Sequence, residues 1–445
     1  MFSLAGADLV HFLFAVAALL AVAHLLGYLA ERLAIPRVIG EVGAGLVLGP
    51  TVLGAWFPGV FHTMFLGFPA EGTLFGLLSQ LGLMFLMFHS GLKFQARFES
   101  SDLRIGVSII AASTILPFLA GWLLTAVWDP SSFMGPAHQD TALKIVIAIS
   151  VAVTSIPVIS KIFADLGILH SRFAKVIVAV AGVHDILLWV ALAVASSLVS
   201  SHGTVNAAIL LKSLGVTFGF LGVCTVVVPW VLRRVTSRRA NLLFRASFLG
   251  YFLLILLVLS DIAGYLKVDV MYGALLAGVA TKLTLPPRLL ERIEAGTREL
   301  SFSLFIPVYF AVVGLQLDLA HRFPIGFFLV YLLFATLVQT VVVYVTCRTI
   351  RCDRLTSLNL AAAMNARGGP GIVLSTVAYA LGIINAEFFA VLVMLALVTS
   401  WMAGSWLRFV IRRGWRLMPG DENLVVERVQ ADPVELTPGW ETGRR

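Results

Sequence analysis

An ionisable pair, His184-Asp185, stands in the middle of an apolar segment of this chain. Asp185 is the only acidic residue between Val176 and Val194. A carboxylate at membrane depth is costly and most often serves transport or proton relay, although a neutral carboxyl group in a hydrogen bond between helices is the alternative. Because a low-dielectric cavity favours the uncharged form, one carboxyl group can hold either a proton or a monovalent cation there. We therefore interpret Asp185 as a site for which these two ions compete.

His184 is the chain neighbour of Asp185, but it points about 100° away around a helix. A histidine that is hydrogen-bonded between helices is at least as favoured an interpretation as a direct ligand. A protonated imidazole would repel a cation and weaken its binding to Asp185, and histidine titrates near neutral pH. His184 is therefore also a hypothetical pH sensor.

More polar groups interrupt the preceding apolar segment, residues 143–164. Thr154 and Ser155 come just before Pro157, which lacks a backbone donor. Carbonyl groups freed at such a break can complete an oxygen shell around a cation together with the two hydroxyls. Packing of Ser and Thr between helices is the alternative.

A matching interruption occurs far along the chain, in the sequence AMNARGGPGIV, which contains Arg367 and Pro370. Arg367 either places positive charge near the crossing of the two broken segments or reaches toward water from the cytoplasmic end of its own segment. The two interrupted segments are an odd number of segments apart, so they cross the membrane in opposite senses. This pattern is typical of inverted repeats in transporters, whereas proline that only serves helix packing is the alternative.

The composition places these residues in a membrane protein. The chain of 445 residues is 59% hydrophobic and 13% charged, whereas soluble domains carry about 25% charged residues. Apolar runs recur along nearly the whole length and predict an all-α polytopic fold with about thirteen spans. The expected spans are 9–30, 38–54, 73–92, 104–128, 143–164, 173–200, 206–232, 244–262, 268–283, 301–317, 325–347, 355–382 and 387–411.

The distribution of charged residues also agrees with a membrane protein. The net charge of +8 comes from short loops between spans, so it does not indicate a nucleic-acid partner. Lys and Arg gather in the loops after odd-numbered spans, which predicts an outside N-terminus and a cytoplasmic C-terminus. Cys224, Cys347 and Cys352 are interpreted as reduced thiols rather than a zinc site, and no cofactor is expected.

Two parts are expected along the chain. Residues 1–416 would form the transmembrane unit, made of a scaffold and an ion-transporting core. Residues 417–445 would form a short cytoplasmic tail, which is expected to be disordered because it is polar and rich in Pro and Gly.

Several stretches resemble the monovalent cation/proton antiporter superfamily, in its bacterial sodium/proton and potassium-efflux branch. The resemblance covers nearly all of residues 10–411 and rests on IPRVIGEVGAGLVLGPTVLG, LGLMFLMFHSGLKF, VTSIPVISKIFADLGIL, VAGVHDILLW, FIPVYFAVVGLQLDL and AMNARGGPGIVL. It implies a homodimer in the inner (plasma) membrane whose core of six helices moves like an elevator against a rigid scaffold. It also implies that Na⁺ or K⁺ is exchanged for one or two protons, with Asp185 as the essential carboxylate.

The sequence departs from the family pattern in four places. His184 replaces the first member of an acidic or amide pair, and Lys93 replaces an acid in the third span. The eleventh span has Gln339 or Val341 where electrogenic members carry a lysine that pairs with that first acid, and Gly369 replaces an acid in the twelfth span. The acid and the lysine that would form a salt bridge in electrogenic members are thus both absent, which avoids an unpaired buried charge. With one titrating carboxylate left, we expect electroneutral exchange.

A sodium- or potassium-for-proton antiporter is thus the first hypothesis. The second is a potassium-efflux channel-like or sensory protein that kept the fold and lost tight proton coupling. An intramembrane enzyme has little support, because the sequence contains no HExxH or GxSxG motif.

Overall fold

The computed structural model describes residues 5–33, 35–93, 102–154, 156–169, 171–200, 207–236, 241–321 and 323–421. Every element named over these ranges is helical, so the predicted all-α class is confirmed. The α-helices are α1 (Gly6–Arg32), α2 (Arg37–Leu48), α3 (Leu53–Trp56), α4 (Pro58–Phe65), α5 (Glu71–Lys93), α6 (Leu103–Val127), α7 (Asp140–Ala152), α8 (Ile156–Asp165), α9 (Arg172–Ser200), α10 (Ala207–Gly222), α11 (Val228–Thr236), α12 (Leu242–Ala246), α13 (Phe248–Tyr265), α14 (Val270–Thr284), α15 (Pro287–Leu300), α16 (Ile306–Leu315), α17 (Ile325–Thr349), α18 (Arg354–Met364), α19 (Gly368–Ala380) and α20 (Ala386–Arg412).

Ten helical stretches among the described residues are long and apolar enough to cross a membrane. The difference from the expected thirteen has a physical reason. Two expected spans, 143–164 and 355–382, are each divided into two short helices, and α14 has only 15 residues. The count of thirteen and the orientation stay predictions.

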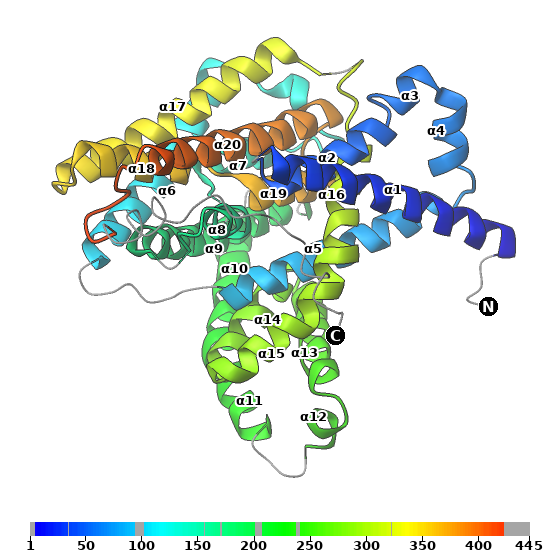
Figure 1. Ribbon diagram of the computed structural model, residues 1–445, viewed down its shortest axis with the longest axis horizontal. Helices are drawn as coiled ribbons and strands as arrows, with labels where there is room; N and C mark the ends of the chain where they lie inside the picture. The colour runs from blue at the N-terminus through cyan, green and yellow to red at the C-terminus, as the bar shows by residue number, and fades with distance from the viewer. Residues whose placement is uncertain are drawn as a thin grey trace, which may run out of the picture.

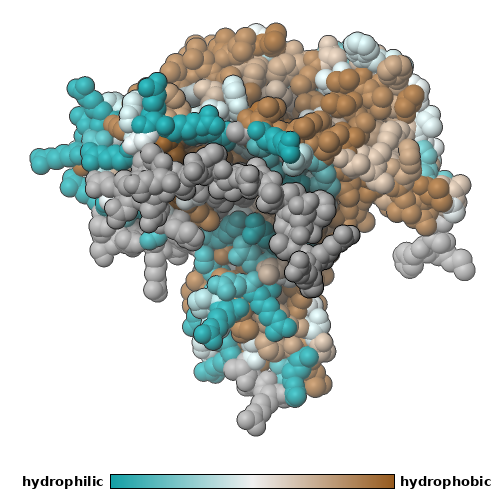
Figure 2. Space-filling model, viewed as in Figure 1, coloured by the Kyte–Doolittle hydropathy of each residue, from teal (hydrophilic) through white to brown (hydrophobic). Residues whose placement is uncertain are grey.

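The helices divide into an outer and an inner set. Only 17% of the apolar window of α1 and 28% of that of α17 are buried, against 72% for both α9 and α20. Figure 1 shows α1 to α4 on one side of the molecule and α6, α17 and α18 on the other, and Figure 2 shows apolar side chains over much of the upper part of the same face. A lipid-facing surface is expected to look like this, while α9, which carries Asp185, lies inside.

Both predicted interruptions are present. The first lies between α7 and α8, where Val153 and Thr154 are not helical, as expected. The second lies between α18 and α19, so Arg367 is at the break, whereas Pro370 already belongs to the first turn of α19. Proline is tolerated in a first turn because backbone N–H groups there have no partner within the helix.

Glycines allow four helices, α2, α5, α14 and α16, to pack with their backbones in close contact. A Cβ atom on Gly91 of α5 would lie 2.1 Å from the Leu275 carbonyl oxygen of α14, and one on Gly45 of α2 would lie 1.9 Å from that of Ala311 of α16. Gly45, in the GAGLVLG sequence of residues 43–49, therefore serves close helix packing, and these four helices form one tightly packed group.

The chain that follows α20 turns back onto the bundle. Leu417 and Met418 are buried, and Asp421 accepts hydrogen bonds from the backbone nitrogens of Arg172 (2.8 Å) and Phe173 (3.1 Å) at the start of α9. The expected tail thus begins with a segment, residues 417–421, in which Leu417, Met418 and Asp421 are buried against the bundle. Its remainder, 422–445, lies outside the described residues, and the domain boundary after residue 416 stays a prediction.

Candidate functional site

Asp185 is a buried carboxyl group with one unoccupied oxygen. It is 3% exposed, and its Oδ2 accepts a long hydrogen bond from the Ser90 hydroxyl of α5, at 3.3 Å. Its Oδ1 is buried and has no hydrogen-bond partner among the described residues. Unpaired buried oxygen is costly, so this atom is available to a proton or to a cation.

His184 faces another helix, α6. Its Nε2 lies 3.1 Å from the hydroxyl oxygen of Ser113, and that hydroxyl donates its own hydrogen to the Ile109 carbonyl at 2.5 Å. The Ser113 oxygen must therefore accept, which places the imidazole hydrogen on Nε2 and leaves Nδ1 as a lone-pair acceptor. Nδ1 is buried and unpaired over the described part of the chain. The interpretation of His184 as an interhelical hydrogen-bonding residue fits this geometry.

Arg367 occupies the crossing of the two broken helices. Its guanidinium donates to the carbonyls of Ser150 (3.1 Å) and Val151 (3.1 Å) at the end of α7, to that of Ala335 in α17 (2.9 Å), and to Oδ1 of Asn365 (3.3 Å). A cation is favourable at a helix C-terminus, where carbonyl groups lack partners within the helix. Arg367 is 1% exposed, so the alternative in which it reaches toward water is wrong.

Thr154 ties the two breaks together. Its hydroxyl, which is fully buried, donates to the Met364 carbonyl at 2.6 Å. The hydroxyl oxygen keeps lone pairs for a further contact. Ser155, the other hydroxyl expected to bind the cation, lies outside the described residues.

Nearly the whole chain is similar in sequence to known proteins. The family model described as "Sodium/hydrogen exchanger, transmembrane" matches residues 18–413. The chain belongs to the sodium/hydrogen exchanger family. This places it in the monovalent cation/proton antiporter superfamily, as the sequence motifs predicted.

Relatives of this family member come from plants, cyanobacteria and yeast. It is 28% identical over 424 residues to cation/H(+) antiporter 17 of Arabidopsis thaliana, with 91% of this chain and 49% of the relative covered. It is 26% identical to the Na(+)/H(+) antiporter NhaS4 of a Synechocystis strain, covering 86% and 92%, and 28% identical to K(+)/H(+) antiporter 1 of Saccharomyces cerevisiae, covering 88% and 45%. The chain thus spans about half the length of the plant and yeast relatives.

A solved structure supports the fold. The sodium proton antiporter MjNhaP1 from Methanocaldococcus jannaschii, at pH 8, superimposes with a TM-score of 0.61, 16% sequence identity and coverage of 91% of this chain and 98% of that one. This likeness concerns the arrangement of helices alone.

Gln339 is the remaining predicted residue of this exchanger-family site. It is fully buried in α17, one turn beyond Ala335, and both polar atoms of its amide lack hydrogen-bond partners among the described residues. Gln339 therefore faces the interior with unused donor and acceptor capacity, at the position where electrogenic members of the family were expected to carry lysine.

Sequence reasoning missed several polar partners. Tyr331 lies two turns before Gln339 on the same helix, and its hydroxyl is 2.6 Å from that of Ser150. Ser90 and Asn365 occur inside motifs that the sequence singled out, but nothing in the motifs shows which helix each one faces. The four-residue spacing of Tyr331, Ala335 and Gln339 was the available signal for one internal face of α17.

The structure forms two groups from these residues. Asp185 and His184 join α9 to α5 and α6, while Thr154 and Arg367 join the two broken helices. No hydrogen bond or ion pair within the described ranges connects the two groups directly. No cluster of three or more His, Cys, Asp or Glu side chains suited to a metal ion occurs in those ranges either.

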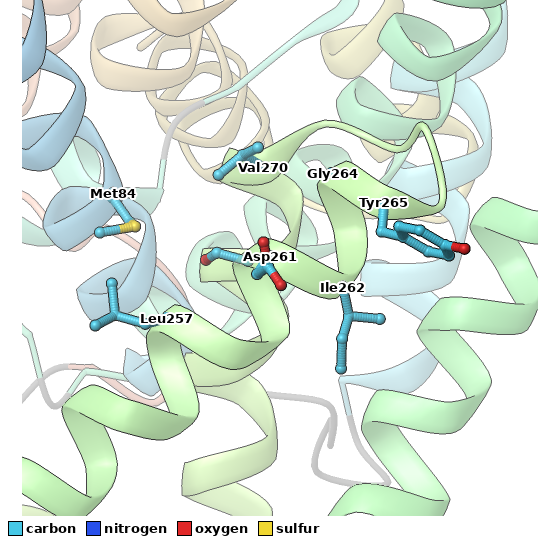
Figure 3. A pocket seen from close by; sticks show the side chains of 8 residues that line it. Met84, Leu257, Asp261, Ile262, Gly264, Tyr265 and Val270 are labelled. Carbon is cyan, nitrogen blue, oxygen red and sulfur yellow. The ribbon is translucent and has the colours of Figure 1, made fainter.

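An open pocket of about 490 Å³ lies elsewhere, between α5, α13 and α14 (Figure 3). None of the predicted site residues lines it. The side chains and backbone around it belong to Met84, Leu257, Ser260, Asp261, Ile262, Gly264, Tyr265 and Val270. It is therefore separate from the candidate ion site.

Proposed function

We propose that this chain exchanges a monovalent cation, Na⁺ or K⁺, for a proton across the membrane, and that both ions compete for Asp185. The observation that carries this proposal is the buried Oδ1 of Asp185 on an internal helix, which has no hydrogen-bond partner among the residues that the structure describes. The relatives named for Na⁺/H⁺ and K⁺/H⁺ antiport support the ion classes. Relatives with transport names also favour a transporter over an enzyme.

One carboxyl group sets the stoichiometry that we propose. When a cation displaces the Asp185 proton, the charge at the site is the same in both loaded states. His184 is placed as a neutral hydrogen-bond donor to Ser113, and Gln339 is uncharged. Exchange of one cation for one proton would therefore be electroneutral.

The proposed movement depends on two sets of helices that are held together in different ways. Close backbone contacts of glycines hold α2, α5, α14 and α16 together, which suits a rigid scaffold. Hydrogen bonds of Thr154 and Arg367 hold α7, α17, α18 and α19 together, which suits a core that moves as one body. In an elevator motion the Ser90–Asp185 hydrogen bond, which spans α5 and α9, would break and re-form. A homodimer in the inner (plasma) membrane, with a cytoplasmic C-terminus, completes this proposal.

The test is exchange in proteoliposomes that contain a pH-sensitive dye. Addition of Na⁺ or K⁺ is expected to move protons in the wild type, with no effect of a clamped membrane potential, and Asp185→Asn is expected to abolish this flux. Thr154→Ser, which keeps the hydroxyl, is the matched control and is expected to retain exchange. Full exchange in Asp185→Asn would overturn the proposal, while cation flux without proton movement would favour the channel-like alternative.

A further inference from the structure

The end of α17 brings two cysteines together. The backbone nitrogen of Cys352 donates to the Cys347 carbonyl at 2.9 Å, that of Arg351 donates to the Arg348 carbonyl at 3.2 Å, and Arg351 has a φ of 71°. These features define a Schellman motif, in which the side chains at the Cys347 and Cys352 positions commonly contact each other. The turn that ends the helix therefore juxtaposes two thiols.

The Schellman turn sets the Cys347 and Cys352 side chains against each other. Both cysteines are unbridged. Cys347 is fully buried, whereas Cys352 is half-buried and lies outside the span that ends at Thr349. A small reagent can thus reach Cys352 first, with Cys347 directly behind it.

Charged groups around Cys352 favour its thiolate. The hydrogen bond with Cys347 lowers the pKa of Cys352 to about 7, with further lowering by Arg172 and Arg348, although burial and Asp353 act in the opposite direction. A thiolate near neutral pH, beside a second thiol, is the arrangement of a redox-active pair.

We propose that Cys347 and Cys352 form a thiol–disulfide exchange site that reacts with small disulfides. In the first step the Cys352 thiolate attacks one sulfur of the small disulfide, forming a mixed disulfide and releasing one small thiolate. In the second step Cys347, after losing its proton to that thiolate or to water, attacks Cys352 Sγ and releases the second small thiolate. The protein is oxidised by two electrons and the small disulfide is reduced to two thiols.

Oxidation of Cys347 and Cys352 would change the connection between α17 and α18. The loop that contains Cys352 joins α17 to α18, and Asp353 caps α18 by accepting a hydrogen bond from the Thr356 nitrogen at 3.2 Å. A disulfide would close the short loop between Cys347 and Cys352 and fix the corner between these two helices. Gln339 lies on α17, and Arg367 lies at the break that follows α18.

The experiment uses the full-length protein in liposomes and a small aliphatic disulfide, hydroxyethyl disulfide. In a Cys224→Ser background only the two proposed cysteines are present. After oxidation, acid quenching and denaturation, both thiols are expected to be protected from a maleimide, and the intact mass should show the loss of hydrogen without an adduct. Reduction with dithiothreitol should restore both thiols.

Single replacements in the same background distinguish the attacking thiol, Cys352, from the resolving thiol, Cys347. Cys347→Ser is expected to keep a stable mixed disulfide on Cys352, because nothing can resolve it, and Cys352→Ser is expected to leave Cys347 unmodified. Size-exclusion chromatography of each variant establishes that it is folded. Two free thiols after oxidation, a persistent adduct with both cysteines present, or equal modification of Cys347 in Cys352→Ser would each overturn the proposal.

Discussion

At the scale of single residues, the neighbours His184 and Asp185 divide their contacts between two helices. Asp185 accepts from Ser90 of α5, and His184 donates to Ser113 of α6. A helix turns by about 100° per residue, so neighbouring side chains necessarily face different partners. This geometry leaves the carboxyl group for ions and lets the imidazole act on it only through its charge.

Replacing His184 by Asn tests whether this charge sets the pH dependence of exchange. The amide nitrogen can still donate to the Ser113 oxygen, but the variant has no titrating group at this position. A protonated His184 would repel the cation, so wherever His184 gains its proton the apparent cation affinity should fall more steeply with acidification in the wild type than in His184→Asn. The measurement is the Na⁺ and K⁺ dependence of proteoliposome exchange over a series of decreasing pH values. Identical profiles would remove the pH-sensor hypothesis.

The reaction of Cys352 gives a second prediction at the residue scale. Since the thiolate is the nucleophile, and its pKa is lowered to about 7 by the hydrogen bond with Cys347, adduct formation should be slow in acid. The rate in Cys224→Ser/Cys347→Ala, in which residue 347 can no longer donate a hydrogen bond to Cys352, should level off only at higher pH than the rate in Cys224→Ser. The pseudo-first-order rate of alkylation at Cys352, followed by mass spectrometry between pH 5 and 9, checks both. Equal inflection points would show that the hydrogen bond does not set this pKa.

At the scale of helices, the proposed scaffold and the proposed core are held together by two different kinds of contact. The proposed scaffold is joined by glycine contacts in which one backbone lies against another, and the proposed core is joined by buried hydrogen bonds across two helix breaks. The Arg367 guanidinium donates hydrogen bonds both to the end of α7 and to the middle of α17. Side chains that satisfy free helix ends hold broken helices in register, whereas glycine contacts depend on shape alone.

Glycine contacts between α5 and α14 are tested by adding a single methyl group. In Gly91→Ala the new Cβ would lie 2.1 Å from the Leu275 carbonyl oxygen, whereas Gly76, on the same helix, has nothing within 4 Å of that position. Overpacking of this kind costs about 1–3 kcal/mol. Gly91→Ala should therefore lose thermal stability in detergent, measured by size-exclusion chromatography after heating, while Gly76→Ala should match the wild type. Equal stability of the two variants would contradict the packing that we describe.

At the scale of the whole molecule, the chain after α20 reaches back to the start of the helix that carries Asp185. Arg172 donates to Asp102 at the start of α6 (2.7 Å) and to the Pro419 carbonyl (3.0 Å), while Asp421 caps the first turn of α9. A carboxylate at a helix N-terminus is stabilising. The start of α6, the start of α9 and the segment that follows α20 are thus joined by these hydrogen bonds.

Removing the Asp421 carboxylate tests how much these hydrogen bonds stabilise the protein. Asp421→Ala leaves the nitrogens of Arg172 and Phe173 without their acceptor, and loss of a helix cap costs about 1 kcal/mol. We expect a lower melting temperature of the purified protein. Glu291→Ala, an exposed acidic residue of α15, is the matched control and should melt like the wild type. An unchanged melting temperature in Asp421→Ala would show that water replaces the carboxylate without loss.

The sequence by itself determined the membrane-spanning all-α class, the family, the buried acid Asp185 and the two helix breaks. These features are local: apolar runs, a carboxylate within one of them, and prolines that follow polar residues. Only the tertiary structure decided that Arg367 is internal, that Ser90 and Ser113 are the partners of the His184-Asp185 pair, and that a helix-ending turn brings Cys347 against Cys352. Contacts between segments depend on how helices rotate and pack and on how a turn is closed, and residue spacing along one segment does not specify either.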